Sequence, residues 1–356
     1  MPDRRSNDVI IRREGRAGRI TMNRPQALNA LTYPMVGEIQ RALDDWERDP
    51  DVALVNLDGA GDRALCAGGD VRAMYDSAPQ GSGLARRFWA DEYRLNACIG
   101  RYPKPYVAFM DGIVMGGGFG LSGHASHRIV TERSQLAMPE TGIGLIPDVG
   151  GTWLLAHAPG ETGIYLGLVG ERMRGAGTIH ARFADAFVPS SQLAALADAL
   201  VAPDASPVDD IIARFSQPPP PSDLAAHAPE IDAAFRFDTV EQIRAALAGM
   251  SSDWARKTLA DLDRRSPLAL KLTLAAIRNA RGLPSLEAAL NVEFRLTVRL
   301  FEHGEFIEGV RALLVDKDKS PKWHPPTLAG VSEAMVEHFL SPLPPSEALE
   351  LRAPSA

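Results

Sequence analysis

The alternation of apolar and polar residues changes from a strand period to a helical period near the start of the chain. Residues 9–13 and 19–22 have the pattern of two short strands joined by a turn at residues 14–18, which predicts a hairpin. Over residues 32–46, apolar side chains recur at helical spacing, with Thr32 as a helix cap and a proline in the first turn. We therefore expect a hairpin followed by an amphipathic helix.

Three later apolar runs have the length expected of buried parallel strands. They cover residues 52–57, 106–110 and 128–131. Segments with helical spacing separate them, and strands that alternate with helices form right-handed crossovers. The predicted fold class is α/β, and no regular repeat indicates a solenoid.

Proline marks a change in the chain near residue 200. Pro203, Pro207 and the proline run at 218–221 interrupt regular structure, whereas apolar residues from Leu268 onward return to helical spacing. We therefore expect four parts in order: a core over residues 1–200, a connecting segment over 201–265, a helical region over 266–340 and a loose tail over 341–356.

Composition limits the kinds of partner. The 356 residues are 45% hydrophobic and 23% charged, as in ordinary globular proteins, and the net charge of -7 disfavours nucleic acid as a partner. Cys66 and Cys98 are the only cysteines, and no CxxC or paired Cys/His spacing occurs. We expect neither a disulfide framework nor a zinc site, which fits a reducing cytoplasm.

The N-terminal residues indicate where in the cell the protein is expected to be. Residues 1–20 contain no apolar signal-peptide core, and no stretch has the roughly 20 apolar residues needed to span a bilayer. Several arginines there are typical of a transit peptide, but Asp3, Asp8 and Glu14 interrupt the acid-poor composition of such peptides. We expect no cleaved presequence, no membrane segment and a cytoplasmic location.

Two glycine-rich segments each follow a predicted strand and precede a predicted helix. They are residues 64–70, which contain Gly69, and residues 115–120, which contain Gly117. Two such turns can direct two backbone N–H groups at one oxygen, and an oxyanion-hole donor contributes about 3 kcal/mol to catalysis. Ordinary tight turns are the alternative interpretation. A phosphate-binding loop is less favoured, because neither GxxxxGK[ST] nor GxGxxG is present.

Two carboxylates, Glu140 and Asp148, lie in the otherwise apolar and glycine-rich residues 138–151. Removal from water raises the pKa of a carboxyl group into the range useful for acid–base catalysis. Alternatively, Asp148 caps a helix that begins near Gly150, and Glu140 is a surface acid. The residues alone leave these interpretations balanced.

His124, His127 and Cys66 are further side chains that could carry chemistry. Two histidines three residues apart on a helix are more often packed or solvated than catalytic, so we favour a structural role for them. Cys66 has no histidine nearby in the sequence, which favours a structural thiol over a nucleophile.

Taken in this order, the three segments resemble the crotonase (enoyl-CoA hydratase/isomerase) superfamily over about the first 190 residues. Residues 23–31 are similar to the family's opening signature, which lies near the CoA adenine and pantetheine. The resemblance implies a fold of stacked ββα turns, usually assembled as trimers or hexamers. It also implies that the amides of Gly69 and Gly117 bind the thioester carbonyl oxygen.

One departure and one further match favour a particular branch of the superfamily. Gly120 occupies the position where enoyl-CoA hydratases generally carry their first catalytic glutamate. Residues 306–312 and 316–323 resemble the C-terminal signature of the 3-hydroxyisobutyryl-CoA hydrolases, which extends the likeness to about residue 325. The residues from roughly 200 to 260 match less clearly.

The resemblance implies hydrolysis of a short 3-hydroxyacyl-CoA thioester, with 3-hydroxyisobutyryl-CoA of valine catabolism as the expected substrate. Glu140 and Asp148 would be the catalytic carboxylates, and Glu92 and Gly117 would join them in binding the substrate. Glu140 would either attack the carbonyl carbon or act as a base on water. CoA is then part of the substrate, and neither a separate cofactor nor a metal is expected.

The sequence is also compatible with two other functions. An enoyl-CoA hydratase or isomerase would use Glu140 with Asp148 as its second acid, and a non-catalytic scaffold would bind acyl-CoA or RNA. The intact Gly69, Gly117 and Glu140 argue against an inactive site, and the acidic composition argues against RNA. Assembly into a homo-oligomer stays open, and so does the acyl group, because a methyl group changes binding by only about 1 to 3 kcal/mol.

Overall fold

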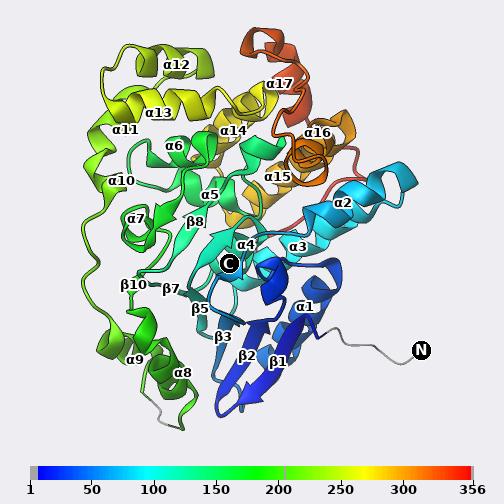
Figure 1. Cartoon of the computed structure of the whole chain (residues 1–356). Helices are drawn as coiled ribbons and strands as arrows, with labels where there is room; N and C mark the ends of the chain where they lie inside the picture. The colour runs from blue at the N-terminus through cyan, green and yellow to red at the C-terminus, as the bar shows by residue number, and fades with distance from the viewer. Residues whose placement is uncertain (1–6, 204–205, 354–356) are drawn as a thin grey trace. The chain divides into compact units, whose positions relative to one another are not determined.

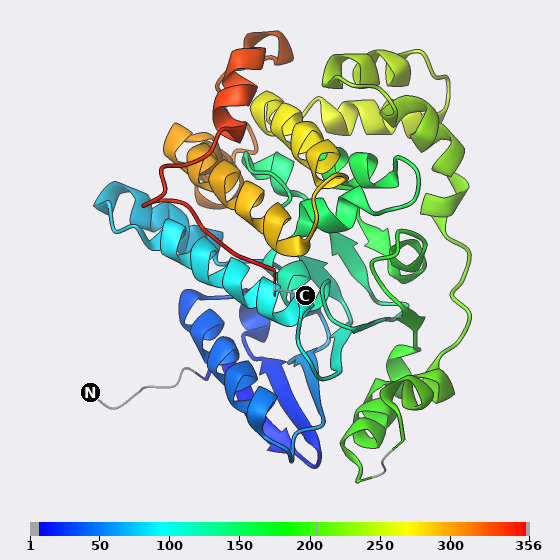
Figure 2. The same ribbon diagram turned by 180° about the vertical axis from the view of Figure 1, so that it is seen from behind.

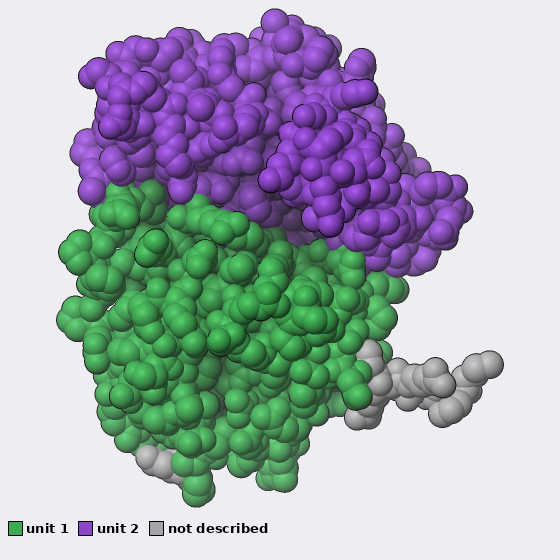
Figure 3. All heavy atoms as spheres, viewed as in Figure 1, with its two compact units in different colours: residues 1–70, 94–136, 172–225 green, residues 71–93, 137–171, 226–356 purple. Residues whose placement is uncertain are grey.

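The structure, a computed structural model, describes residues 7–203 and 206–353 (Figure 1). Asp3, one of the acids that disfavour a presequence, lies outside the described residues. The chain forms two compact units that are each discontinuous in sequence (Figure 3). Unit 1 comprises Met1–Asp70, Arg94–Leu136 and Arg172–Ala225, and unit 2 comprises Val71–Tyr93, Ala137–Glu171 and Ala226–Ala356. The predicted division into contiguous sequence blocks stays a prediction.

Unit 1 is built on a six-stranded sheet. The strand order is β1-β2-β3-β5-β7-β10, in which β1 pairs with β2 antiparallel and the remaining pairs are parallel. Its strands are β1 (Val9–Glu14), β2 (Ala17–Met22), β3 (Leu54–Gly59), β5 (Tyr106–Met110), β7 (His127–Val130) and β10 (Ala186–Phe187). The three predicted parallel strands and the α/β class are confirmed.

A four-stranded sheet in the order β4-β6-β8-β9 completes the strands of unit 1. It consists of β4 (Ala64–Cys66), β6 (Ile113–Met115), β8 (Gln135–Ala137) and β9 (Met173–Arg174). These strands have only two or three residues each, and β4, β6 and β8 follow closely after β3, β5 and β7. Their shortness explains why apolar patterning did not predict them.

The N-terminal hairpin and helix form as predicted. β1 and β2 pair from Val9 opposite Met22 to Glu14 opposite Ala17, which leaves a two-residue turn. α1 (Tyr33–Arg48) follows, with Thr32 as N-cap and a proline in its first turn. Its apolar face is buried, and both views show α1 beside β1 and β2 (Figures 1 and 2).

The other helices of unit 1 cover and connect these strands. α8 (Leu193–Val201) and α9 (Val208–Phe215) pack against the six-stranded sheet, since Leu196, Leu200 and Ile211 share a buried cluster with Leu54 and Val107. The other short helices are η1 (Pro25–Ala27), α4 (Gly117–Ser122), α7 (Gly175–His180) and η4 (Ser190–Gln192). α3 (Leu84–Gly100) passes from unit 2 into unit 1, and α10 (Asp223–Ala226) lies where the chain leaves unit 1 after Ala225.

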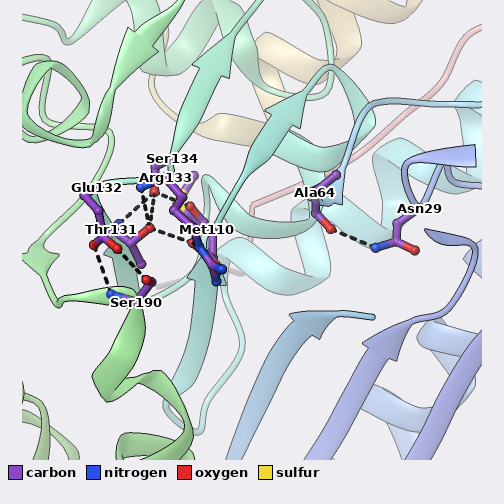
Figure 4. A network of polar contacts seen from close by, with 9 residues as sticks. Asn29, Ala64, Met110, Thr131, Glu132, Arg133, Ser134 and Ser190 are labelled. Atoms are coloured by element: carbon purple, nitrogen blue, oxygen red, sulfur yellow. Dashed lines mark hydrogen bonds and ion pairs between the residues drawn. The ribbon is translucent and has the colours of Figure 1, made fainter. Parts of the chain in front are cut away.

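Polar side chains fix the ends of the unit 1 strands (Figure 4). Ser134 Oγ donates to Met110 O at 2.7 Å and accepts from Thr131 N at 2.7 Å, which joins the ends of β5 and β7. Glu132 accepts a hydrogen bond from Ser190 N at 3.0 Å, which holds η4 to the same loop. The turns that leave this sheet edge are therefore held by hydrogen bonds.

Unit 2 contains helices and loops in its described part. Its first helices are α2 (Val71–Ser77), η2 (Ala78–Gln80), η3 (Glu140–Ile143), α5 (Gly151–Ala156) and α6 (Thr162–Val169). The helices after residue 226 are α11 (Ala228–Phe235), α12 (Val240–Ala248), α13 (Asp253–Leu262), α14 (Pro267–Ala280), α15 (Leu286–His303), α16 (Glu305–Val310), the π-helical turn η5 (Arg311–Val315), η6 (Leu328–Gly330) and α17 (Glu333–Leu340). The predicted helical pattern after Leu268 is confirmed.

Serine caps set the starts of four of these helices, among them α17, which Ser332 caps. Ser252, Ser266 and Ser285 precede α13, α14 and α15, and each hydroxyl accepts a hydrogen bond from the backbone N–H three residues later. Such a cap satisfies an amide that the helix itself cannot pair and contributes about 1 kcal/mol. None of the described helices is long and apolar enough to cross a membrane.

The segment after α17 is attached to unit 2. It runs back along α15 (Figure 2), and Asn291 bonds both the N–H and the C=O of Leu351 at 2.9 Å. Leu349 is buried, and Arg299 donates to the carbonyl oxygens of Phe339 and Ser341. The expectation of a loose tail is therefore wrong for residues 341–353, because these polar contacts lie too far apart in sequence to show as a pattern.

Candidate active site

The two predicted oxyanion turns follow the carboxyl ends of β4 and β6, two neighbouring strands in the four-stranded sheet of unit 1. β4 and β6 run parallel with Cys66 opposite Val114, and Gly69 and Gly117 each come three residues after these partners. Among the described residues, the backbone bonds around the turns use neighbouring amides such as that of Asp70, not those of Gly69 or Gly117. Gly117 also begins α4, where an amide has no acceptor within the helix. Both amides are available to an oxygen ligand.

Glycine is required where the two turns touch. A Cβ atom on Gly118 would lie 2.2 Å from the carbonyl oxygen of Cys66, which is a backbone atom that cannot easily move. Gly68 has φ +117°, a conformation that side chains disfavour, and its Cβ position lies 3.5 Å from Met115 O. The glycines let the backbones of the two turns approach each other, as an oxyanion hole requires.

Asn29 fixes the approach to the first turn. It is 1% exposed, and its Nδ2 donates to Ala64 O at 2.8 Å (Figure 4) and to Ala60 O at 3.0 Å. Its Oδ1 accepts from Arg24 N at 2.8 Å. Residues 23–31, predicted to lie near CoA, thus hold the entry to β4, and their contact with CoA stays a prediction.

Glu92, Glu140 and Asp148 are buried acids of unit 2. Their exposed fractions are 2%, 5% and 5%. Glu92 lies in α3, Glu140 begins η3, and Asp148 precedes α5. Burial raises the pKa of both Glu92 and Glu140 well above the usual value, and the charge of Asp148 raises both further. The alternative of a surface-exposed Glu140 is therefore wrong.

Tyr93 holds Asp148 in place. Tyr93 Oη donates to Asp148 Oδ2 at 2.7 Å and lies 3.5 Å from Thr297 Oγ1. Burial raises the pKa of Asp148 to about 6, although the hydrogen bond from Tyr93 lowers it. An acid with this pKa can both accept and donate a proton near neutral pH.

Backbone strain lies directly beside Asp148. Val149 has φ +56° although its side chain is β-branched and buried, and such a conformation costs about 1 to 3 kcal/mol. Residues are held in this way where the surrounding structure fixes them, often next to a functional group. The strain fits a loop that is shaped to present Asp148.

Two carboxylate oxygens in this group have no hydrogen-bond partner among the described residues. They are Glu140 Oε2 and Glu92 Oε1, both on side chains that are at least nine-tenths buried. A buried polar atom without a partner costs roughly 1 to 3 kcal/mol, which a fold tolerates where a ligand supplies the partner. The two oxygens therefore indicate a site where a polar ligand supplies the missing hydrogen bonds.

Glu293 is a fourth buried acid, which the sequence analysis missed. It lies on α15, and its carboxylate accepts from Gly150 N at 2.7 Å and from Thr152 N at 2.9 Å, with a further contact to Thr152 Oγ1. Burial raises the pKa of Glu293 to about 8, against the hydrogen bonds that lower it. Glu293 thus caps α5, so the alternative interpretation, in which the Asp148 side chain caps this helix, is wrong.

The pattern around Glu293 contains a signal that could have revealed it. Leu290, Glu293, Phe294 and Thr297 occupy one face of α15, and all four are buried. A glutamate on the apolar face of a helix must be paired or functional, because burying an unpaired charge is very costly.

We expect Tyr93→Phe to shift the pH profile of catalysis. Without the tyrosine hydroxyl the pKa of Asp148 rises, so the acid limb of kcat/KM moves to higher pH by about one unit. Steady-state rates from pH 4.5 to 8.5 measure the shift. Tyr102→Phe is the matched control, since Tyr102 Oη donates to the carbonyl oxygen of Leu43 and to no carboxylate among the described residues. An unmoved limb in Tyr93→Phe would contradict the role of this hydrogen bond.

Cys66 and His127, two further candidates from the sequence, have contacts in unit 1 that indicate structural roles. Cys66 is fully buried, and its Sγ lies 3.6 Å from Gly68 O, which supports a structural thiol. His127 contacts Ser126 Oγ at 2.9 Å and Asp209 Oδ1 at 3.2 Å, so it joins β7 to α9. No group of three or more His, Cys, Asp or Glu side chains in residues 7–203 and 206–353 could hold a metal ion.

Comparisons with known proteins identify relatives over nearly the whole chain. A family described as enoyl-CoA hydratase/isomerase matches residues 17–340. A Danio rerio protein named 3-hydroxyisobutyryl-CoA hydrolase, mitochondrial, is 41% identical over 351 residues, which are 96% of this chain and 92% of the relative.

Two solved structures share the whole fold. A carnitinyl-CoA dehydratase from Mycobacterium thermoresistibile has a TM-score of 0.92 at 46% identity and covers 97% of this chain and 99% of its own. An enoyl-CoA hydratase from Rhodobacter sphaeroides 2.4.1 has a TM-score of 0.92 at 43% identity, covering 97% and 100%. The predicted stacked core with a C-terminal helical region is thereby confirmed.

Proposed function

The chain belongs to the enoyl-CoA hydratase/isomerase family, and from this membership we propose that it hydrolyses a short 3-hydroxyacyl-CoA thioester to CoA and the hydroxy acid. 3-Hydroxyisobutyryl-CoA is the expected substrate, because that name belongs to the Danio rerio relative. The observation that carries the proposal is the pair of buried acids, Glu140 with an unpartnered oxygen and Asp148 with a pKa of about 6.

The oxyanion is the charge that must be stabilised during hydrolysis. As a nucleophile adds to the thioester carbonyl, its oxygen becomes negative, and the amides of Gly69 and Gly117 would donate to it. Each such donor contributes about 3 kcal/mol to transition-state stabilisation. Backbone amides suit this task because they need no reorganisation as the charge develops.

The carboxyl groups would handle the protons as a coupled pair. Glu140 is the more weakly acidic member, because burial and the Asp148 charge both raise its pKa. The raised pKa favours the protonated form of Glu140, and this proton must leave Glu140 before that residue attacks the carbonyl or activates water. Asp148 can receive it and then protonate the leaving thiolate, so that the C–S bond breaks without releasing a strong base.

Glu92 would contact the acyl group, and its unpartnered Oε1 supports that role. A neutral carboxyl group donates one hydrogen bond and accepts others, as recognition of a substrate hydroxyl requires. Burial and the charge of Asp148 raise the pKa of Glu92 well above its usual value, which favours the protonated form of this carboxyl group. A 3-hydroxyl group on the acyl chain matches this donor and acceptor set.

A hydratase is the second candidate, since both solved relatives carry dehydratase or hydratase names. Gly120 argues against it, because the first catalytic glutamate of enoyl-CoA hydratases would stand there and a glycine supplies no acid. The test is release of free thiol, followed with a disulfide dye, from 3-hydroxyisobutyryl-CoA, 3-hydroxypropionyl-CoA and crotonyl-CoA. Thiol release from a hydroxyacyl-CoA is expected. Loss of crotonyl absorbance without thiol release would overturn the proposal in favour of the hydratase.

The cytoplasmic location stays a prediction. It rests on cysteine usage and on the acids near the N-terminus, whereas the Danio rerio relative is named mitochondrial. Cell fractionation with an antibody against the chain would decide between these locations. Homo-oligomer formation likewise stays a prediction.

A further inference from the structure

Lysine is rare in this chain and concentrated in one place. The chain has 38 basic residues, of which only six are lysines, and three of these are Lys317, Lys319 and Lys322. All three are exposed. Because arginine supplies nearly all other positive charge, the use of lysine here indicates a local requirement. These three residues, with Leu313 and Leu314 before them, are called the lysine segment below.

Arg311 binds the acidic side chains of this region, so these acids do not pair with the three lysines. Arg311 donates to Glu308 at 2.8 Å, to Asp316 at 2.6 Å and to Asp318 at 2.7 Å. The two aspartates alternate with Lys317 and Lys319 in sequence, so an ion pair within the segment would be expected. The described residues instead show no hydrogen bond or ion pair for the three ammonium groups, because Arg311 binds the neighbouring acids.

The backbone of the segment is held in unusual conformations. Lys317 has φ +58° and Lys319 has φ +53°, in the left-handed region that side chains disfavour. They follow the π-helical turn η5, a type of turn that is frequent at functional sites. The Lys322 N–H donates to Glu308 at 2.6 Å, which closes the loop. The contacts of Arg311 and Glu308 thus hold a conformation that the chain would not adopt alone.

Two exposed leucines adjoin the lysines. Leu313 is 47% exposed and Leu314 is 37% exposed, and Ile10 is the only other large hydrophobic residue so exposed among the described residues. The segment therefore presents an apolar surface next to three positive charges. Its turn packs against α2, the helix that begins two residues after Gly69 in the sequence.

We propose that the lysine segment binds the nucleotide end of an acyl-CoA substrate. That end carries a diphosphate and a 3′-phosphate beside an adenine ring, which matches three ammonium groups beside two apolar side chains. Lysine suits a flexible phosphate chain, because each ammonium is a compact charge with three donors on a mobile stem. This inference rests on the proposed function for its ligand but concerns binding, which can be measured without turnover.

The test compares the triple variant Lys317→Ala/Lys319→Ala/Lys322→Ala with the wild type by calorimetric titration of CoA at 50 and 300 mM salt. The variant is expected to bind CoA at least tenfold more weakly, with a smaller salt dependence, because fewer ion contacts remain to be screened. Pantetheine, which lacks the phosphates, is expected to bind both proteins equally. Lys257→Ala is the matched control, since Lys257 is 62% exposed and lies on α13.

A second variant separates the apolar contribution. Leu313→Ser/Leu314→Ser is expected to weaken CoA binding while the salt dependence stays that of the wild type, a result that loss of fold would not give. Unchanged CoA affinity in the triple variant would overturn the inference. If that variant instead lost a salt-sensitive self-association, the lysine segment would be an interface between copies of the chain. CoA binding that depends on these lysines in a protein that releases no thiol would refute only the proposed hydrolysis.

Discussion

Glu140→Gln is expected to abolish most thiol release while leaving the fold intact. The amide can neither attack the carbonyl nor accept a proton, and loss of a catalytic carboxylate lowers kcat by about 10² to 10⁴. The substitution keeps the shape of the side chain and removes a buried acid whose Oε2 has no partner among the described residues. The melting temperature should therefore stay equal or rise.

Glu305→Gln provides the matched control for this change. Glu305 is 2% exposed, and its carboxylate bonds Ser266 Oγ at 2.5 Å and the His324 N–H at 3.2 Å. Burial raises the pKa of Glu305 as it does that of Glu140. Its loss should lower stability with little change in kcat, the opposite of the expected result at Glu140. Near-normal thiol release by Glu140→Gln would remove Glu140 from the catalytic step.

A single turnover in ¹⁸O-labelled water separates the two routes open to Glu140. Direct attack forms a mixed anhydride, and water that opens it at the enzyme carbonyl leaves one heavy oxygen in the Glu140 carboxylate. General base catalysis delivers the heavy oxygen only to the product acid. Heavy oxygen in the peptide that contains Glu140, detected by mass spectrometry, would establish the anhydride route.

The parts of the fold that repeat a local pattern could be predicted from the sequence. α1 and the opening hairpin are examples, because a period of 3.6 or 2 decides which side chains face the core. β9 and β10 have two residues each, too few to show any period. The attached C-terminal segment was also missed, since its contact between Asn291 and Leu351 joins residues distant in sequence.

The candidate site likewise has residues that could be predicted from the sequence and partners that could not. Gly69, Gly117, Glu140 and Asp148 were predicted because each lies in a short segment of distinctive composition. The partners that set their chemistry are remote: Tyr93 is 55 residues before Asp148, and Glu293 is 143 residues after Gly150. No single segment contains both members of these contacts, so only the folded chain reveals the burial that raises the pKa of Asp148 to about 6 and the Tyr93 hydrogen bond that opposes this rise.

Asp148→Asn is expected to lower kcat by about 10² to 10³ and at the same time to stabilise the protein above pH 6. Burial raises the pKa of Asp148 from 3.8 to about 6, so the folded protein holds this proton more tightly than the unfolded chain does. Ionisation of Asp148 therefore disfavours the fold at each pH above its unfolded pKa, and the penalty is complete above about pH 6. At about 1.4 kcal/mol per unit, the penalty amounts to about 3 kcal/mol.

The sign of this effect makes the prediction specific. The asparagine variant cannot ionise, so its advantage in free energy of unfolding should be near zero at pH 4, grow up to pH 6 and then stay constant. Urea unfolding of both proteins at pH 4, 5, 6 and 8 measures it. Asp253→Asn, at a side chain that is 96% exposed, should show no such dependence. An advantage that falls as pH rises would mean that ionised Asp148 stabilises the fold, and the strain at Val149 would then need another explanation than the placement of a catalytic acid.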